Sequence, residues 1–293
     1  MTKPAFIPLR SCSIDIHPNA RWKQNGLTVA GGNGQGNGID QLSYPWGLYV
    51  DDDQTVYIAD SGNPHIVKWE SGATSGQVVA GGNEEGSGVH QLSDPRDVMV
   101  DNERDSVIIC DNSNRRVVRW PRQNGTSGET IISNIDCLGL TIDENGSLYV
   151  VSFENAEIRR YQRGEYQGTV VAGVYVSDYG NHRVMKWREG AKAGIIVAGV
   201  HGDGNGLTQL SNPRGVVVDQ WGTVYVADYG NARIMRWPKA ATQGSIMVGV
   251  NGEGGQSNQL NVPTGLSFDQ HGNLYVVDNQ NHRVQKFDLE FNG

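Results

Sequence analysis

The chain repeats three short phrases at intervals close to 50 residues. The first runs from a proline or cysteine to an aspartate and occurs at Pro45–Asp51, Pro95–Asp101, Cys137–Asp143, Pro213–Asp219 and Pro263–Asp269. The second ends at an aromatic residue and occurs at Val56–Trp69, Val107–Trp120, Leu148–Tyr161, Val174–Trp187, Val224–Trp237 and Leu274–Phe287. The third completes the unit and is clearest at Val78–Gly81, Val170–Gly173 and Ile196–Gly199. Several copies in the same order indicate one supersecondary unit used repeatedly.

The phrases are typical of short β-strands joined by tight turns. Their β-branched runs are too short for helices, and both faces are apolar, as in strands packed between neighbouring sheets. Gly-Asn pairs such as Gly230-Asn231 supply turns in which a positive φ is tolerated, and 39 of the 293 residues are glycine. Four strands per unit at this period predict an all-β propeller over residues 20–293, preceded by an N-terminal extension over residues 1–19.

The repeated elements resemble the NHL repeat. The fifth unit carries them as Pro-x-Gly at 213–215, Val-Asp at 218–219, Tyr-Val-Ala-Asp at 225–228 and Asn-x-Arg-Ile at 231–234. The resemblance covers about residues 20–287 and implies a β-propeller of six repeat units. NHL propellers bind proteins, RNA or small ligands, and some are enzymes, so the resemblance predicts the fold and leaves the function open.

The two ends of the chain complement each other. The last repeat ends at Phe287, and the six residues after it are too few for a fourth strand and its loop. The segment Trp22–Gly31 is similar in kind to Trp187–Gly199, which ends in the third phrase of another unit. We therefore expect Leu27–Ala30 to form the outer strand of the last blade and to latch the ring.

The fourth unit is incomplete. Tyr161 and Trp187 are only 26 residues apart, about half the usual step, because Gly173 is followed directly by Val174. A strand of five or six residues is about 17–20 Å long, so no linker remains to bring the chain back to an innermost strand. Three explanations stay open: a fused strand Thr169–Ser177 that leaves five complete blades, a hairpin at Ala172-Gly173 that makes Glu165–Val171 a substitute inner strand, or a chain shortened by deletion or misjoining.

Charge and cysteine content restrict the partners. The net charge of −8 disfavours nucleic acid, because an acidic surface repels phosphate groups. No run approaches the roughly 18 apolar residues of a membrane span, and residues 1–10 lack the apolar core of a signal peptide. We expect a soluble monomer of unassigned compartment. We interpret Cys12, Cys110 and Cys137 as buried free thiols, with one disulfide and a spare thiol as the alternative.

Residues that differ between repeats at the mouth of the central channel form the candidate binding site. Strand order places two sets of connections on one face of the ring, here called the loop-rich face: the loops leading into each innermost strand, and the turns between the second and third strands. Side chains directly after the first residue of an innermost strand point to the channel mouth on this face, and Trp and Arg often dominate binding interfaces. The candidate ligand-binding residues are Trp46, Arg96, Arg214 and Thr264, with Tyr179 and Tyr229 in neighbouring turns.

Other polar motifs are interpreted as scaffold because they recur around the ring. The recurring aspartates, which can accept backbone N–H bonds at turns, are Asp60, Asp111, Asp178, Asp228 and Asp278. The recurring arginines are expected to pair with carboxylates between blades; they are Arg116, Arg183, Arg233 and Arg283. His65, His182 and His282 lie in different units, so we predict no metal, no cofactor and no catalytic residue.

These observations favour a non-enzymatic scaffold that binds a protein or peptide on its loop-rich face. Two alternatives remain. The resemblance also implies propeller lyases and lactone hydrolases, which need a metal at the channel, and the sequence offers no converging set of histidines and carboxylates. It also implies RNA-binding NHL domains, against which the net charge argues.

Overall fold

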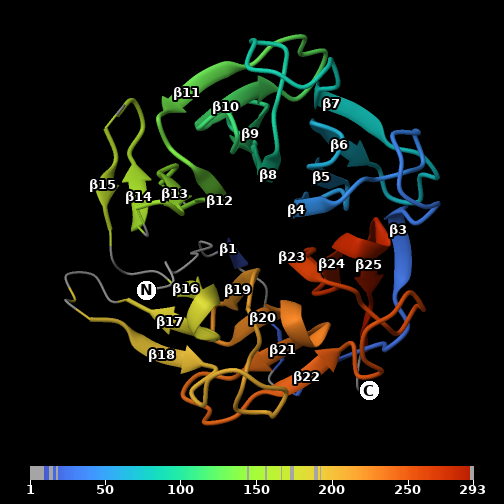
Figure 1. Cartoon of the computed structure of the whole chain (residues 1–293), viewed down its shortest axis with the longest axis vertical. Coiled ribbons are helices and arrows are strands. Elements are labelled where there is room, and N and C mark those ends of the chain that lie inside the picture. Colours follow the sequence, from blue (N-terminus) through green and yellow to red (C-terminus); the bar gives the residue numbers. More distant parts are fainter. Residues whose placement is uncertain are drawn as a thin grey trace.

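Each repeat folds into a small antiparallel sheet, and six such sheets stand around a central axis (Figure 1). The computed structural model describes residues 10–12, 16–17, 19–143, 145–155, 157–165, 167–171, 175–187, 191 and 193–290. Within these residues the only helices are three single turns of 3-10 helix, η1 (Tyr179–Asn181), η2 (Tyr229–Asn231) and η3 (Asn279–Asn281). No helix of the described chain is long and apolar enough to cross a membrane. The architecture is the all-β, six-bladed propeller expected from the repeats.

The strands of a blade follow one another from the axis outward (Figure 1). Blade one consists of β4 (Pro45–Val50), β5 (Val56–Asp60), β6 (His65–Trp69) and β7 (Gln77–Gly81). Blade two consists of β8 (Pro95–Asp101), β9 (Ser106–Asp111), β10 (Arg116–Pro121) and β11 (Glu129–Ser133). Blade three consists of β12 (Cys137–Ile142), β13 (Leu148–Ser152), β14 (Glu157–Tyr161) and β15 (Thr169–Val170).

The second half of the chain continues the ring. Blade four has three strands, β16 (Tyr175–Asp178), β17 (Arg183–Lys186) and β18 (Ile195–Ala198). Blade five consists of β19 (Val216–Asp219), β20 (Val224–Asp228), β21 (Arg233–Trp237) and β22 (Ser245–Val248). Blade six consists of β23 (Pro263–Phe268), β24 (Leu274–Asp278), β25 (Arg283–Phe287) and β3 (Leu27–Gly31).

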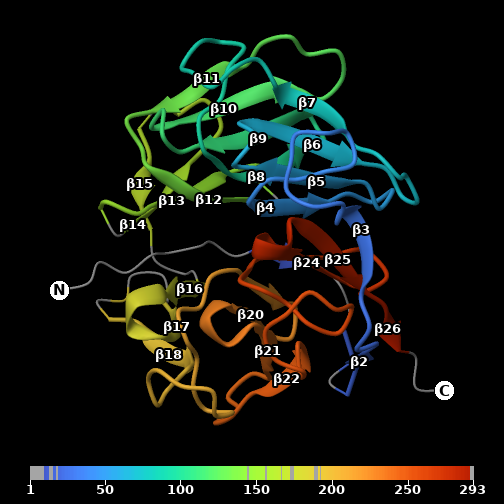
Figure 2. The same cartoon turned by 45° about the vertical axis from the view of Figure 1, so that its right-hand side comes forward.

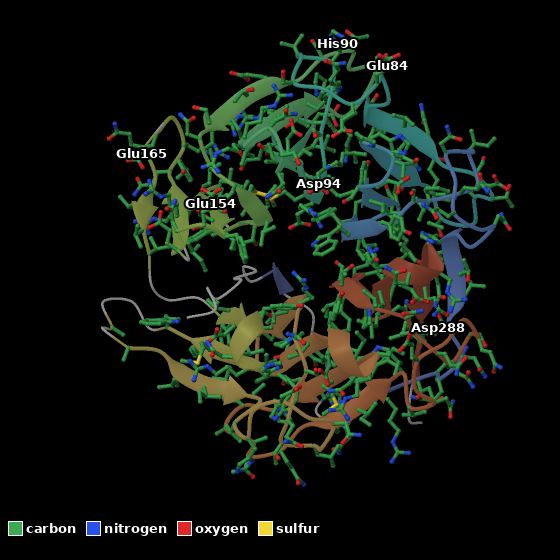
Figure 3. The ribbon with its side chains drawn as sticks, in the orientation of Figure 1. Glu84, His90, Asp94, Glu154, Glu165 and Asp288 are labelled. Carbon is green, nitrogen blue, oxygen red and sulfur yellow. A yellow bond between two sulfur atoms is a disulfide. The ribbon has the colours of Figure 1, made fainter. Side chains whose placement is uncertain are left out.

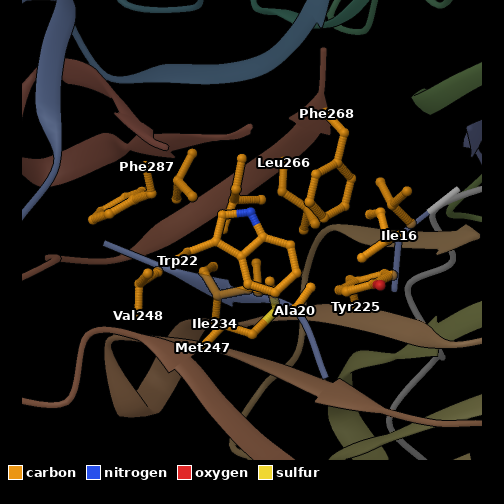
Figure 4. Close-up of a cluster of buried hydrophobic side chains, with 14 of the residues drawn as sticks. Ile16, Ala20, Trp22, Tyr225, Ile234, Met247, Val248, Leu266, Phe268 and Phe287 are labelled. Carbon is orange, nitrogen blue, oxygen red and sulfur yellow. The ribbon is translucent and has the colours of Figure 1, made fainter. Parts of the chain in front are cut away.

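The N-terminal part of the chain completes blade six. β3 pairs antiparallel with β25, from Arg283 opposite Gly31 to Lys286 opposite Leu27. Close by, β2 (Arg21–Trp22) pairs with β26 (Leu289–Glu290) (Figure 2). The Trp22 ring lies 3% exposed among residues of blades five and six (Figure 4), and its Nε1 donates to the Gly272 carbonyl at 2.9 Å. Both ends of the chain therefore share one sheet and one core.

Blades three and four keep separate sheets where the sequence is short. β15 pairs with β14, and β16 pairs with β17. The fused strand that would leave five blades is therefore wrong, and so is a substitute inner strand made by Glu165–Val171. The physical reason is local, because Thr169 and Val170 keep the antiparallel partners that an outer strand of blade three requires. Residues 172–174, which join the two sheets, lie outside the described residues.

One strand was not expected from the sequence. β1 (Arg10–Cys12) pairs in parallel with β19, from Arg10 opposite Val217 to Cys12 opposite Asp219. It therefore lies on the axis side of blade five, beside the place where blade four lacks an innermost strand (Figure 1). The division of the chain at residue 20 stays a prediction.

Apolar side chains fill the boundaries between neighbouring blades. Five of the six boundaries hold at least ten buried residues each, and Trp69, Trp120 and Trp237 are among the largest. At the boundary of blades three and four, the cluster within the described residues has three buried members, Val151, Ile158 and Val176. We call this boundary the seam. A missing innermost strand removes side chains that would have been buried there, so the seam is the thinnest part of the core.

The cysteine interpretation needs correction. Cys110 in β9 and Cys137 in β12 form a disulfide across the boundary of blades two and three, with Cα atoms 5.3 Å apart (Figure 3). The prediction of free thiols is therefore wrong for these two residues. Cys137 begins the innermost strand of blade three, and this places it beside Cys110, near the end of the second strand of blade two. Of Cys12 the structure describes the backbone in β1.

Candidate binding site at the channel mouth

The recurring aspartates and arginines hold the loops of the loop-rich face. In blade five, Asp228 accepts the Ser211 N–H at 2.7 Å and the Arg233 Nε–H at 2.7 Å. The rest of the Arg233 guanidinium donates to carbonyls of the loop before β19, those of Asn205, Gly206 and Gln209. Burial raises the pKa of Asp228, and the hydrogen bonds it accepts oppose that rise. The expectation that these arginines pair between blades is wrong, because donor and acceptor lie five residues apart on one hairpin.

Blade four shows what the loop contributes. Arg183 pairs with Asp178 at 2.8 Å in the same way as Arg233 pairs with Asp228, but the loop before the innermost strand is missing from its repeat. The Arg183 side chain is 34% exposed, against 6% for Arg233. The pair itself therefore needs only the hairpin, and the loop supplies the burial.

The residue after each of these aspartates differs around the ring. In three blades it is polar and donates to the carbonyl of the first residue of the next innermost strand: Ser61 to Pro95, Asn112 to Cys137 at 2.8 Å, and Asn279 to Pro45 at 2.6 Å. We call blades six, one and two the polar half. In blades three, four and five the corresponding residues are Phe153, Tyr179 and Tyr229, and we call these blades the aromatic half. This position thus provides a side-chain hydrogen bond at three boundaries and holds an aromatic residue in the other three blades, where Ser177 of blade four instead donates to the Arg214 carbonyl at 2.6 Å.

Five of the predicted site residues gather at the channel mouth. The Trp46 ring contacts two guanidinium groups, with the Arg96 Cζ 4.2 Å and the Arg214 Cζ 5.0 Å from its centroid. Arg214 also lies 4.0 Å from the Tyr179 centroid and 5.1 Å from that of Tyr229. The two tyrosine rings meet edge to face at 6.2 Å. These contacts join blades one, two, four and five across the axis.

The two arginines have different surroundings. Arg96 donates to the carboxylate of Asp94 through Nε at 2.7 Å and forms an ion pair with it through Nη2 at 2.6 Å; Asp94 lies beside the central opening (Figure 3). Arg214 has no carboxylate partner among the described residues, and its Nε is buried without a hydrogen-bond partner there. Burial lowers the pKa of the Arg214 guanidinium, which Tyr179 and Tyr229 oppose. Both arginines are partly buried.

Thr264 lies at the same position in blade six but differs from the other candidates. Its side chain is 1% exposed, and its Oγ1 donates to the Trp46 carbonyl at 2.8 Å. It therefore fixes the backbone that carries the indole. The binding role of all six residues stays a prediction.

The pocket at the mouth includes residues that the sequence reasoning missed. Of the predicted residues, Trp46, Arg96 and Thr264 line this pocket, whereas Arg214, Tyr179 and Tyr229 do not; its lining also includes Asp97, Leu138 and Leu266. Leu138 could have been found, because it follows Cys137 as Trp46 follows Pro45. The glycine of the Pro-x-Gly element has a steric reason: a Cβ on Gly47 would lie 2.4 Å from an Asp97 carboxylate oxygen. Innermost strands of neighbouring blades thus approach too closely for a side chain.

The histidines make local contacts in separate places. His65 Nε2 lies 3.1 Å from Asp60, while His182 and His282 accept backbone N–H bonds through Nδ1 from Asn212 and Tyr44. Across the described ranges, no three side chains of His, Cys, Asp or Glu gather as metal ligands would.

Comparison with known proteins adds the family. Residues 42–69, 210–236 and 260–287 match the NHL repeat, and no curated protein sequence matches the chain. The structure is similar to an auxiliary nutrient binding protein from Bacteroides thetaiotaomicron, with a TM-score of 0.67, 18% identity, and 98% of this chain and 76% of that chain covered. It is similar to a gluconolactonase from Xanthomonas campestris, with a TM-score of 0.64, 13% identity and 99% of each chain covered.

A further similar structure is a catalytically inactive variant of virginiamycin B lyase from Staphylococcus aureus with quinupristin. The TM-score is 0.56 at 11% identity, with 93% of this chain and 100% of that chain covered. Identities this low support the fold alone, since one fold serves many functions. Three matching repeats within a ring of six blades make the chain an NHL-repeat β-propeller.

Proposed function

We propose that the chain is a non-enzymatic binding propeller that holds a protein or peptide at the channel mouth of its loop-rich face. The observation that carries the proposal is the cluster of Trp46, Arg96, Arg214, Tyr179 and Tyr229. Trp, Tyr and Arg are the residue types that contribute most at protein interfaces, because they combine apolar area with hydrogen-bonding groups. The cluster is partly buried before any partner binds, so its rings are already ordered.

The carboxylates nearest this cluster support binding rather than acid–base chemistry. Asp94 is paired with Arg96. Asp97 accepts the backbone N–H of Val98 at 3.0 Å and that of Leu140 at 2.9 Å. A general base needs an oxygen that can reach a substrate proton, and both side chains are already engaged by the scaffold. No observation at the mouth favours the lyase or lactone hydrolase alternative for this chain.

A random peptide library selected on the immobilised protein tests the proposal. We expect enriched peptides to bind Trp46→Ala at least about tenfold more weakly, since interface tryptophans often contribute 2 kcal/mol or more. Trp221→Ala is the matched control, because Trp221 is 55% exposed on a turn between the first two strands, on the opposite face. Melting curves of both variants separate a loss of binding from a loss of folding. Failure to enrich any peptide, or equal binding to Trp46→Ala, contradicts the proposal.

A further inference from the structure

Arg214 carries a positive charge that the described protein does not balance. Its neighbours are three aromatic rings and a second arginine, Arg96. Each of the recurring arginines instead donates its Nε–H to an aspartate of its own hairpin, at 2.6 to 2.8 Å. Arg96 likewise has Asp94. Arg214 therefore differs from the recurring arginines and from Arg96, each of which has an aspartate partner.

This arrangement is costly for the unbound protein. A guanidinium removed from water loses hydration, and without a carboxylate it recovers only part of that loss from aromatic faces. The buried Nε of Arg214, which lacks a partner among the described residues, adds an unsatisfied donor. An anion that enters the mouth would supply the missing negative charge.

We propose that Arg214 binds a carboxylate of the peptide ligand, while the rings of Trp46, Tyr179 and Tyr229 hold the guanidinium in place. This inference rests on the proposed function and names the chemistry that the site recognises. A planar guanidinium fits a carboxylate through two parallel hydrogen bonds. Its single unbalanced charge matches a monoanion, whereas the nearby carboxylates of Asp94 and Asp97 and the net charge of −8 disfavour a phosphate dianion.

The test uses N-acetyl-glycyl-glycine, which has a free carboxylate, and its C-terminal amide, with inorganic phosphate as a third probe. Binding to the full chain is measured by calorimetry at constant ionic strength. We expect the acid to bind the unmodified protein at least about tenfold more tightly than the amide, because charged hydrogen bonds are about twice as strong as neutral ones. Arg214→Met should abolish this difference. Arg214→Lys should keep part of it, because the lysine retains the charge without the planar fork.

Arg122→Met is the matched control, since it removes a guanidinium from the turn between β10 and β11, on the opposite face and outside the cluster. Retention of acid binding by Arg122→Met together with its loss in Arg214→Met supports the inference. Equal losses in the two variants would mean general electrostatic attraction and overturn it, as would tighter binding of phosphate than of the acid. Because Arg214 has no carboxylate partner, Arg214→Met should melt no lower than the unmodified protein; a clear fall would assign Arg214 to the scaffold.

The library peptides distinguish this inference from the proposed function. Peptides that lose affinity for Trp46→Ala but bind Arg214→Met normally would support the peptide-binding function and contradict the inference that Arg214 binds a carboxylate of the peptide. If neither the peptides nor the acid bind the unmodified protein, both proposals fail.

Discussion

The polar and aromatic halves of the ring use one repeat position in two ways. In the polar half, Ser61, Asn112 and Asn279 each donate to a carbonyl of the next blade. In the aromatic half the same position holds a ring, and two of these rings, Tyr179 and Tyr229, contact Arg214. The aromatic half also contains the seam, where three of the described apolar residues are buried, against ten or more at each other boundary.

The comparison teaches that closure of the ring does not require every boundary to be equally strong. A propeller with several well-packed boundaries holds a weak one in place, because opening the seam alone still leaves each blade attached to its other neighbour. A turn residue that no longer links blades is then available for recognition. We infer that stability is concentrated in the polar half and at the blade five–six boundary, and that binding is concentrated in the aromatic half.

The largest expected effect follows deletion of residues 1–31. This removes β1, β2 and β3, together with the buried side chains of Ile16, Trp22 and Ala30. Loss of a buried tryptophan alone typically costs about 3–5 kcal/mol, which approaches the stability of a whole domain. We therefore expect the truncated protein to be largely unfolded at ambient temperature, so that circular dichroism shows no cooperative melting transition on heating. Deletion of residues 1–9 is the control, since all described strands remain; equal melting of the longer deletion and the full chain would contradict the account.

The disulfide provides the next effect. Replacing Cys110 and Cys137 with alanine frees a loop of 27 residues, and the chain-entropy estimate for a loop of this size is about 3.5 kcal/mol. Chemical denaturation of the double variant should show that loss. The boundary it crosses is already well packed, so the unfolding transition should stay cooperative. An unchanged denaturation midpoint would mean that the disulfide adds no stability at the boundary of blades two and three.

A pair of matched valines compares the seam directly with a complete boundary. Val176 and Val226 occupy the same place in β16 and β20, and both are essentially buried, at 1% and 0% exposure. Val226→Ala lies in a cluster of ten buried residues and should cost about 2 kcal/mol. Val176→Ala lies in the seam and should cost about 1 kcal/mol, because a small cluster loses fewer contacts. Equal losses in urea denaturation would remove the distinction between seam and boundary.

The sequence was sufficient for the fold because the repeats encode it locally. β-Branched runs, Gly-Asn turns and the recurring aspartates each specify part of a hairpin, and their order specifies the blade. The pairing of β3 with β25 also followed from the similarity of Leu27–Ala30 to other third phrases. The candidate site residues were chosen by a related rule, that positions which differ between repeats at the start of an innermost strand face the channel mouth, and their binding role stays a prediction.

What the sequence could not predict depends on distances between blades. Cys110 and Cys137 stand at different positions of successive repeats, so only the spacing of β9 and β12 brings them together. The burial of Arg214 depends on Trp46 reaching across the axis from another blade. The parallel pairing of β1 with β19 has no counterpart in the other repeats as far as the structure describes them, so the repeat pattern could not predict it.

Two equivalent turn residues, one from each half, test the central claim most directly. Asn112→Ala leaves the Cys137 carbonyl without its side-chain donor and should cost about 1–2 kcal/mol, while the binding of library-selected peptides stays unchanged. Tyr229→Ala should weaken those peptides by at least about tenfold, while stability changes less than in Asn112→Ala. Unfolding free energy and peptide affinity are measured on both proteins. The predicted result is that Asn112→Ala loses mainly stability and Tyr229→Ala loses mainly peptide affinity. Equal losses of stability in the two variants, with peptide affinity unchanged in both, would contradict the account.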